Sequence, residues 1–201
     1  LEKKLAGLNV PVDQWESEIR KQVAKWEILA PDKVVSAGGA TPKTMEDQSV
    51  LMVGKNPIKD DYEFIFKTEQ AVKAIRLEAM VDPALVNGSA SRGFNGNYVL
   101  SEFIVEVQSG DRASYEPVKI ASANADYEQN RYTVDLTIDG RVDATGWAVD
   151  GNTRPDNRVA TYSLEKPITP GTAVRIKMLH RYGGSHQIGR FRISASKTAP
   201  T

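Results

Sequence analysis

Residues 137–151 read TIDGRVDATGWAVDG and contain two Asp-Gly pairs, Thr145 and Trp147. Side-chain oxygens at this spacing could hold a ligand, and the indole could stack on one. The same residues could equally form ordinary turns, because glycine accepts the positive φ that tight turns require. In that alternative Trp147 belongs to the hydrophobic core. The residues alone leave both alternatives open.

Two other segments, SRGFNGN and HRYGGSH, carry the residue types that bind sugars. Flat rings stack on the C–H faces of a sugar, and amide or guanidinium groups reach its hydroxyls. Arginine also binds sulfate or carboxylate groups through two parallel hydrogen bonds. If strands 98–107 and 172–180 are antiparallel neighbours, both segments lie at the same end of the fold. The candidate ligand-binding residues are Arg92, Phe94, Asn95, Asn97, Tyr182, His186 and Arg190.

A purely structural role for several of these residues is an equally specific alternative. Arg92 and Arg190 could pair with Glu78 and Glu102 on a sheet face and hold the long loop down. His180 shares its alternation with Val174, Ile176 and Met178, which favours an inward, hydrogen-bonded histidine over a ligand.

The elements that must position these residues read almost entirely as strands. Short segments with period-two alternation are separated by Gly, Asn and Pro, which is typical of antiparallel sheets with one buried face. So many strands without helices between them require two sheets or a closed barrel. The sequence therefore predicts an all-β antiparallel sandwich of jelly-roll type. The expected strands are 49–54, 61–68, 71–80, 97–107, 131–139, 158–168, 171–182 and 186–196. Two connections, 81–96 and 139–157, are too long for hairpins, and loops of that length are usually functional or disordered.

The N-terminal part differs from the rest. Trp15, Ile19, Val23 and Trp26 recur at helical spacing, which predicts a helix over residues 13–29. The proline at position 31 ends it, because the residue before proline avoids the helical region. We therefore expect residues 1–30 to be a helix and linker from a parent protein, and residues 31–197 to be the β-sandwich.

Taken together, the segments RLEAM, RGFNGNYVLSEFIVEV, IDG…TGWAV and HQIGRFRIS resemble a galactose-binding-like, discoidin-type jelly roll. The resemblance is to modules of large secreted, cytochrome-c-linked proteins of the planctomycete type, and it extends over about residues 26–196. It implies a non-catalytic module described as carbohydrate-binding, in an extracytoplasmic multidomain parent. This is an analogy at the level of the fold.

The same resemblance implies a structural calcium ion in the Asp-Gly-to-Thr loop. Calcium takes six to eight oxygen ligands and tolerates irregular loops. The matching metal donors are Asp139, Asp143 and Thr145, with Asp47 and Asp150 as further acidic candidates. Related sites end in a carboxylate near the C-terminus, where this chain has Arg190 and Arg192, so the expected cage is incomplete.

Composition excludes several classes of function. The chain has no cysteine, which removes disulfides, thiolate metal sites and a cysteine nucleophile. Lys plus Arg equal Asp plus Glu at 26 each, which argues against a dedicated nucleic-acid binder. Two histidines six residues apart make a zinc site improbable. No P-loop, nucleophile elbow or dinucleotide fingerprint is present, and no run is apolar enough to span a membrane.

The leading hypothesis is therefore a non-catalytic module that binds a polysaccharide, with an anionic one as a possibility raised by the arginines. A second hypothesis is a structural domain that packs against neighbouring domains of the same chain. An enzyme would need a paired acid and base that sequence does not place.

Overall fold

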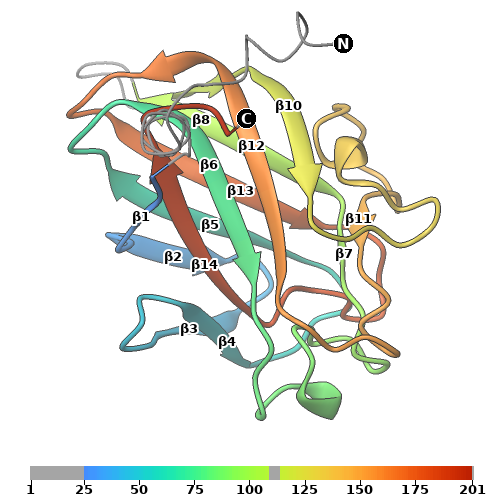
Figure 1. The fold of residues 1–201 in the computed structure, drawn as a ribbon. Helices are drawn as coiled ribbons and strands as arrows, with labels where there is room; N and C mark the ends of the chain where they lie inside the picture. Colours follow the sequence, from blue (N-terminus) through green and yellow to red (C-terminus); the bar gives the residue numbers. More distant parts are fainter. Residues whose placement is uncertain (1–24, 109–113, 201) are drawn as a thin grey trace, which may run out of the picture.

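The computed structural model describes residues 25–108 and 114–200, which form two antiparallel sheets packed face to face (Figure 1). The predicted all-β antiparallel architecture is thus confirmed. The larger sheet has seven strands, six of them in one path. Their order is β10 (Ile120–Ala125), β12 (Arg158–Ile168), β6 (Val72–Ala79), β14 (Arg190–Ser196), β4 (Val50–Gly54) and β3 (Ala40–Thr44), and β1 (Glu27–Ile28) also pairs with β14.

The second sheet has five strands, and a two-strand ribbon lies beside it at the right of Figure 1. The five-stranded order is β2 (Lys33–Ser36), β5 (Asp60–Lys67), β13 (Ala173–His180), β8 (Glu102–Gln108) and β9 (Tyr115–Val118). The ribbon joins β7 (Val99–Leu100) to β11 (Trp147–Ala148). In both large sheets a C-terminal strand occupies an interior position: β13 lies between β5 and β8, and β14 lies between β6 and β4.

The chain crosses between the sheets at their edges. Strand β2 ends one sheet and contacts β3, which ends the other. At the opposite edge, Lys119 alone separates β9 from β10. These crossings bring the two edge strands on each side close together, which limits the open strand edges that promote aggregation.

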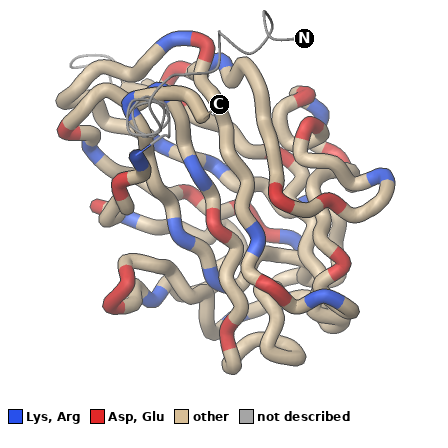
Figure 2. Tube along the Cα trace, viewed as in Figure 1, with Lys and Arg blue, Asp and Glu red and all other residues tan. Residues whose placement is uncertain are grey.

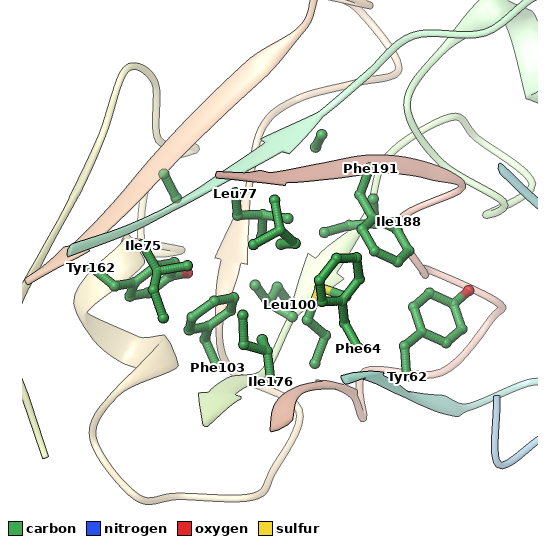
Figure 3. Packing of buried hydrophobic residues seen from close by; sticks show 14 of the residues in the cluster. Tyr62, Phe64, Ile75, Leu77, Leu100, Phe103, Tyr162, Ile176, Ile188 and Phe191 are labelled. Carbon is green, nitrogen blue, oxygen red and sulfur yellow. The ribbon is translucent and has the colours of Figure 1, made fainter. Parts of the chain in front are cut away.

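The core lies between the two sheets and follows the alternation seen in the sequence. On β8, Phe103 and Val105 point inward, while Ile104 and Glu106 lie on the other face and are partly exposed, as expected for a strand with one buried face. Phe103 stacks on Tyr162 of the opposite sheet, with ring centroids 3.8 Å apart and planes inclined by 3° (Figure 3). Such pairs join the layers, because aromatic rings bury large apolar areas in defined geometries.

Strand register determines which loops share an end of the sandwich. Strand β13 is antiparallel to both β5 and β8, with His180 opposite Asp60 and Leu179 opposite Glu102. The loops that enter β5 and β8 and the loop that leaves β13 therefore lie at one end. This confirms the antiparallel arrangement on which the candidate ligand-binding residues depended.

One strand expected from the sequence is not a strand. In the segment 131–139, Val134–Thr137 forms a 3-10 helix called η3. The two buried residues of this segment, Val134 and Thr137, are three positions apart, which is the spacing of one 3-10 turn and not of a strand. The Thr137 hydroxyl donates to the Val134 carbonyl oxygen at 2.7 Å, which stabilises the turn.

The helix expected over residues 13–29 lies mostly outside the described residues. The prediction is wrong for the last part of this helix, because Glu27–Ile28 is strand β1 and pairs with Ala195 and Ser194 of β14. Strand β4 pairs with β14 only at Arg190 and Phe191, so β1 supplies strand pairing for β14 farther along the chain. Trp26 lies next to this strand, with the Arg76 guanidinium 5.1 Å from its ring centroid.

Candidate functional site

Four rings form a continuous row at the end of the sandwich where the 92–97 and 181–187 loops meet. Phe94 contacts His186 with centroids 5.7 Å apart, and His186 contacts Tyr182 at 4.9 Å. Tyr182 contacts Tyr132 at 6.2 Å. Adjacent planes cross at 86°, 70° and 72°, which are edge-to-face geometries that aromatic pairs prefer. We call Phe94, His186, Tyr182 and Tyr132 the aromatic row.

The aromatic row is exposed where it could contact a ligand. The exposed fraction is 78% for Phe94 and 44% for Tyr182, whereas His186 is buried beneath them. Ile58, with 71% exposed, lies against the same loop, since its carbonyl oxygen accepts the Ser185 N–H at 3.0 Å. Three of the five large apolar side chains exposed in the described residues therefore gather here. Exposed apolar patches of this kind mark interaction sites.

A strained turn holds the middle of the row. Gly183, Gly184 and Ser185 have φ values of 101°, 59° and 58°, in the left-handed region that favours glycine. Ser185 is held there because its hydroxyl donates to the Pro57 carbonyl oxygen at 2.8 Å. A Cβ on Gly184 would lie 2.9 Å from His186 Nδ1, so the ring needs glycine at this position. Strain of this kind persists only where the surroundings enforce it, and it clusters at functional sites.

The far end of the row is also built on an unusual backbone. Arg131 has φ of 70°, and the Tyr132 N–H closes the turn by donating to the Gln129 carbonyl oxygen at 2.9 Å. Burial, followed by the charge and hydroxyl of Tyr182, raises the pKa of Tyr132. The Tyr132 phenol therefore stays neutral at ordinary pH and can donate a hydrogen bond.

Asn97 connects the loops beneath the row and is only 8% exposed. Its Oδ1 accepts the N–H groups of Gly151 at 3.0 Å and Val149 at 3.3 Å. Its Nδ2 donates to Gln129 Oε1 at 2.8 Å, which ties the Phe94 loop to the Tyr132 turn. Asn95 Oδ1 accepts the Asn97 N–H at 3.0 Å. The structure thus places Asn97 inside the protein, whereas Asn95 is half-buried at the surface.

Arg92 is likewise turned inward, with 7% of its surface exposed. Its guanidinium donates to the carbonyl oxygens of Gly54 at 3.0 Å and Lys55 at 2.7 Å. Asn56 Nδ2 donates in return to the Arg92 carbonyl oxygen at 3.0 Å. Arg92 therefore holds the loop before β5 against the Phe94 loop, and its charged group is not presented to solvent.

Arg190 lies in an ion-pair network on the outer face of the seven-stranded sheet. Its guanidinium contacts Asp47 at 2.9 Å and Asp82 at 3.1 Å, and it donates to Ser49 Oγ at 2.9 Å. Arg192 pairs in turn with Glu78 at 2.9 Å. The alternative in which Arg190 forms ion pairs on a sheet face is therefore the arrangement observed. Its partners are Asp47 and Asp82, whereas the sequence suggested Glu78 or Glu102. These contacts separate it from the aromatic row.

The loop expected to hold calcium uses its oxygens for internal hydrogen bonds. Asp139 Oδ1 accepts the Arg141 N–H at 2.8 Å. Asp143 Oδ1 accepts the N–H of Thr145 at 2.8 Å and also its hydroxyl, and Arg141 pairs with the other Asp143 oxygen at 3.1 Å. The Thr145 hydroxyl bond is the first cause of a lowered pKa at Asp143.

These donors do not fit a calcium cage, which needs six to eight oxygens turned toward one point. The two further acidic candidates are also engaged: Asp47 with Ser49 and Arg190, and Asp150 with the Tyr127 hydroxyl at 2.7 Å. Within residues 25–108 and 114–200, no three His, Asp or Glu side chains converge as metal ligands would.

Trp147 and His180 are both interior residues, as their patterns indicated. Trp147 is fully buried, and its indole N–H donates to the Tyr127 carbonyl oxygen at 2.9 Å. Burial lowers the pKa of His180 to about 3, so the ring is neutral. The Ile188 N–H donates to His180 Nε2 at 3.3 Å, and Nδ1 faces the Asp60 carbonyl oxygen at 3.3 Å.

Sequence reasoning missed a carboxyl pair formed by Glu102 and Asp139. Glu102 is 4% exposed, and burial, then the hydrogen bond and charge of Asp139, raise its pKa to about 7. Burial and a neighbouring carboxylate both disfavour the charged form of Glu102. Because the two residues are distant in the sequence, no local pattern could reveal the pair.

Two surface cavities lie away from the aromatic row. One surface cavity of about 760 Å³ lies around the turn between β12 and β13, at the opposite end of the sandwich. Another, of about 470 Å³, lies beside Asp47 and Arg190. Neither of these two cavities is lined by a residue of the row. Within the described residues, no helix has the length and apolarity needed to cross a bilayer.

No model of a known protein family matches the sequence, and no curated protein matches it. Solved structures to which the chain is weakly similar include the Agl-KA catalytic domain, with TM-score 0.37 and 11% identity. They also include the catalytic domain of a GH87 alpha-1,3-glucanase in complex with nigerose, with TM-score 0.33 and 14% identity. Each match covers 89% of this chain, which spans only 29% and 30% of those two chains.

Proposed function

We propose that this protein is a non-catalytic carbohydrate-binding module that holds a polysaccharide against the aromatic row. The observation that carries the proposal is the exposure of Phe94 and Tyr182 on a rigid, strained loop framework. Exposed rings cost solvation free energy unless a partner covers them, and here nothing within the described residues covers Phe94.

The chemistry of the row suits sugars. The face of an aromatic ring is electron-rich, so it attracts the polarised C–H groups on the flat side of a pyranose. Tyr182 adds a hydroxyl beside its ring, and Asn95 has an amide nitrogen that makes no hydrogen bond within the described residues. Apolar faces with a few polar groups at the margin are what binding sites for polar ring ligands need.

The groups near the row support a non-catalytic role. No carboxylate lies in the ring contacts that define it. Glu102 is buried, with 4% of its surface exposed, whereas its neighbour Asp139 is exposed. Under this proposal the fold is a galactose-binding-like jelly roll, and the module serves a secreted multidomain protein outside the cytoplasm, where polysaccharides occur. Fractionation of cells that produce the natural protein would test the location.

The test of binding is a glycan array followed by isothermal titration calorimetry on the best ligand. We expect Phe94→Ala and Tyr182→Ala each to weaken binding by about tenfold or more, as loss of an exposed stacking ring does. Val142→Ala is the matched control, because Val142 is exposed but lies outside the row. If no glycan binds a sample shown to be folded by circular dichroism, the proposal is wrong.

A second candidate function is packing against a neighbouring domain of the same protein. The observation that favours it is Ile58, whose exposed aliphatic side chain adds to the row but offers no ring for sugar stacking. Apolar contact surfaces of this kind also occur between domains.

Hydrogen exchange in the full natural protein would distinguish the two functions. Domain packing predicts that the backbone around Ile58 and Phe94 is more protected in the full protein than in residues 25–200 alone. Equal protection in both forms, together with glycan binding, would favour the carbohydrate-binding function.

A further inference from the structure

We propose that the ligand of the aromatic row is an acidic glycan, carrying carboxylate or sulfate groups that contact Lys59 and Arg131. This inference rests on the proposed carbohydrate-binding function and specifies its ligand class. The shared chemistry is an anionic substituent on a sugar ring, so the experiment below distinguishes uronate from sulfate.

The first support is an uneven charge distribution. The chain as a whole has zero net charge, with 26 basic and 26 acidic residues. The four segments that build the row, 54–60, 92–97, 129–132 and 181–187, contain five Lys or Arg and one Asp or Glu. Elsewhere blue and red segments are interspersed over the strands (Figure 2). A surface with one dominant sign attracts ligands of the opposite sign.

The second support is the position of the free cations. Lys59 follows Ile58, whose backbone is hydrogen-bonded to the Ser185 turn on one side of the row. Arg131 precedes Tyr132 at the other end, in a left-handed backbone conformation held by the Gln129 turn. Both are exposed, and neither forms an ion pair with another described residue. Two exposed cations therefore belong to the backbone segments at the two sides of the row.

The acidic groups nearby do not neutralise these cations. Asp60 is buried, and its carboxylate accepts hydrogen bonds from Gly38 N at 2.7 Å and Ser36 Oγ at 2.6 Å. Asp61 pairs with Arg181. Lys59 and Arg131 thus remain solvent-exposed cations without an ion-pair partner among the described residues.

Ring stacking and charge together would select the ligand. The rings bind the apolar face of a sugar without regard to its charge, whereas guanidinium groups bind carboxylate or sulfate through paired hydrogen bonds. Because Lys59 and Arg131 are exposed, salt screens their attraction, with a Debye length of about 10 Å at 0.1 M ionic strength. Salt dependence therefore separates the charged contribution from the stacking contribution.

The experiment compares acidic oligosaccharides with neutral counterparts of the same backbone, by titration calorimetry on residues 1–201. Oligogalacturonides are compared with their methyl esters, and kappa-carrageenan oligosaccharides with the same oligosaccharides after desulfation. We expect at least one acidic member to bind about tenfold more tightly than its counterpart at 50 mM NaCl, and the advantage to shrink at 500 mM. The pair that shows it identifies carboxylate or sulfate.

Variants assign the effect to named residues. The double variant Lys59→Gln, Arg131→Gln is expected to bring the acidic ligand down to the affinity of its neutral counterpart. Lys166→Gln is the matched control, since Lys166 is exposed at the opposite end of the sandwich and should leave the advantage intact.

Three outcomes would overturn the inference. Equal affinity for acidic and neutral members, with Phe94→Ala weakening both, would leave the carbohydrate-binding function standing and remove the acidic preference. Binding to the acidic members that Phe94→Ala does not weaken would indicate general attraction of polyanions. Absence of binding to all four ligands and across the glycan array would remove both proposals.

Discussion

Asn97 Nδ2 donates to Gln129 Oε1 at 2.8 Å, and this bond joins the loop that carries Phe94 to the turn that carries Tyr132. The two loops are separated by thirty-odd residues of chain, so the amide pair fixes a relationship that no local turn could fix. The aromatic row depends on it, because its two ends belong to these two loops.

Asn97→Ala should therefore lower both stability and glycan affinity. It leaves the N–H groups of Val149 and Gly151 without a partner and removes one of the two donors to Gln129 Oε1, the other being the Asp150 N–H at 3.4 Å. Unsatisfied buried groups cost about 1–3 kcal/mol each, so we expect a loss of roughly 3 kcal/mol in the free energy of unfolding. Urea denaturation measures it. Asn95→Ala, which removes one bond at the half-buried rim, should cost under about 1 kcal/mol; equal losses would contradict the assigned role of Asn97.

Gly184→Ala tests the strained turn beneath the rings. Alanine at φ of 59° is strained, and its Cβ would also lie 2.9 Å from His186 Nδ1. Gly171→Ala is the matched control, because Gly171 has φ of 81° but open space around the added Cβ. We expect Gly171→Ala to cost about 1 kcal/mol from backbone strain alone, and Gly184→Ala to cost more and to weaken glycan binding. Thermal unfolding measures the loss of stability, and titration calorimetry measures the loss of glycan affinity. Identical results for both variants would contradict a close contact that requires glycine at position 184.

Glu102 should make stability depend on pH. Its folded-state pKa of about 7 lies above the ordinary glutamate value of 4.5, so the folded protein binds more protons than the unfolded chain between these pH values. The stabilising contribution is complete below about pH 4.5 and is lost as pH rises through 7. We expect a change on the order of 2 kcal/mol across this window. Glu102→Gln, measured by urea unfolding at pH 5, 6, 7 and 8, should flatten the profile. An unchanged slope in that variant would assign the dependence to another group.

Arg190 should matter for stability and not for glycan binding. Arg190→Met leaves Asp82 without its cation on a partly buried sheet face, and Asp47 keeps only the longer contact with Arg192 at 3.8 Å. Removing one partner of such a network costs about 2–4 kcal/mol, reduced here because Arg190 is partly exposed. Denaturation should show the loss, whereas the affinity for the best glycan should change less than about twofold. A large drop in affinity without a drop in stability would place Arg190 in the binding surface.

Much of the fold followed from alternation in the sequence. Tyr62, Phe64 and Phe66 on β5 and Val174, Ile176 and Met178 on β13 point inward as a period of two requires. The segment around Val134 and Thr137 misled this reasoning, because a short amphipathic run fits both a strand and a tight helical turn. Strands β9 and β10 were not predicted, because edge strands expose most of their side chains and therefore lack the alternation of apolar and polar residues.

The candidate site was only partly predictable. Phe94, Tyr182 and His186 were identified from residue type and converge because β8 and β13 are antiparallel. Tyr132 was missed, since its segment was interpreted as a strand. An arginine or asparagine side chain can bind a ligand or can hydrogen-bond buried backbone groups. Which of these roles Arg92 and Asn97 have depends on the surrounding backbone, which the sequence does not show.

The interior positions of β13 and β14 have a consequence for synthesis. Each sheet is split into two unconnected parts until one of these strands is inserted, because β5 reaches β8 only through β13, and β6 reaches β4 only through β14. A ribosome making this chain must therefore release nearly all of it before either layer can close. The nascent protein is expected to expose apolar faces until its last strands emerge, and to rely on chaperones during that interval.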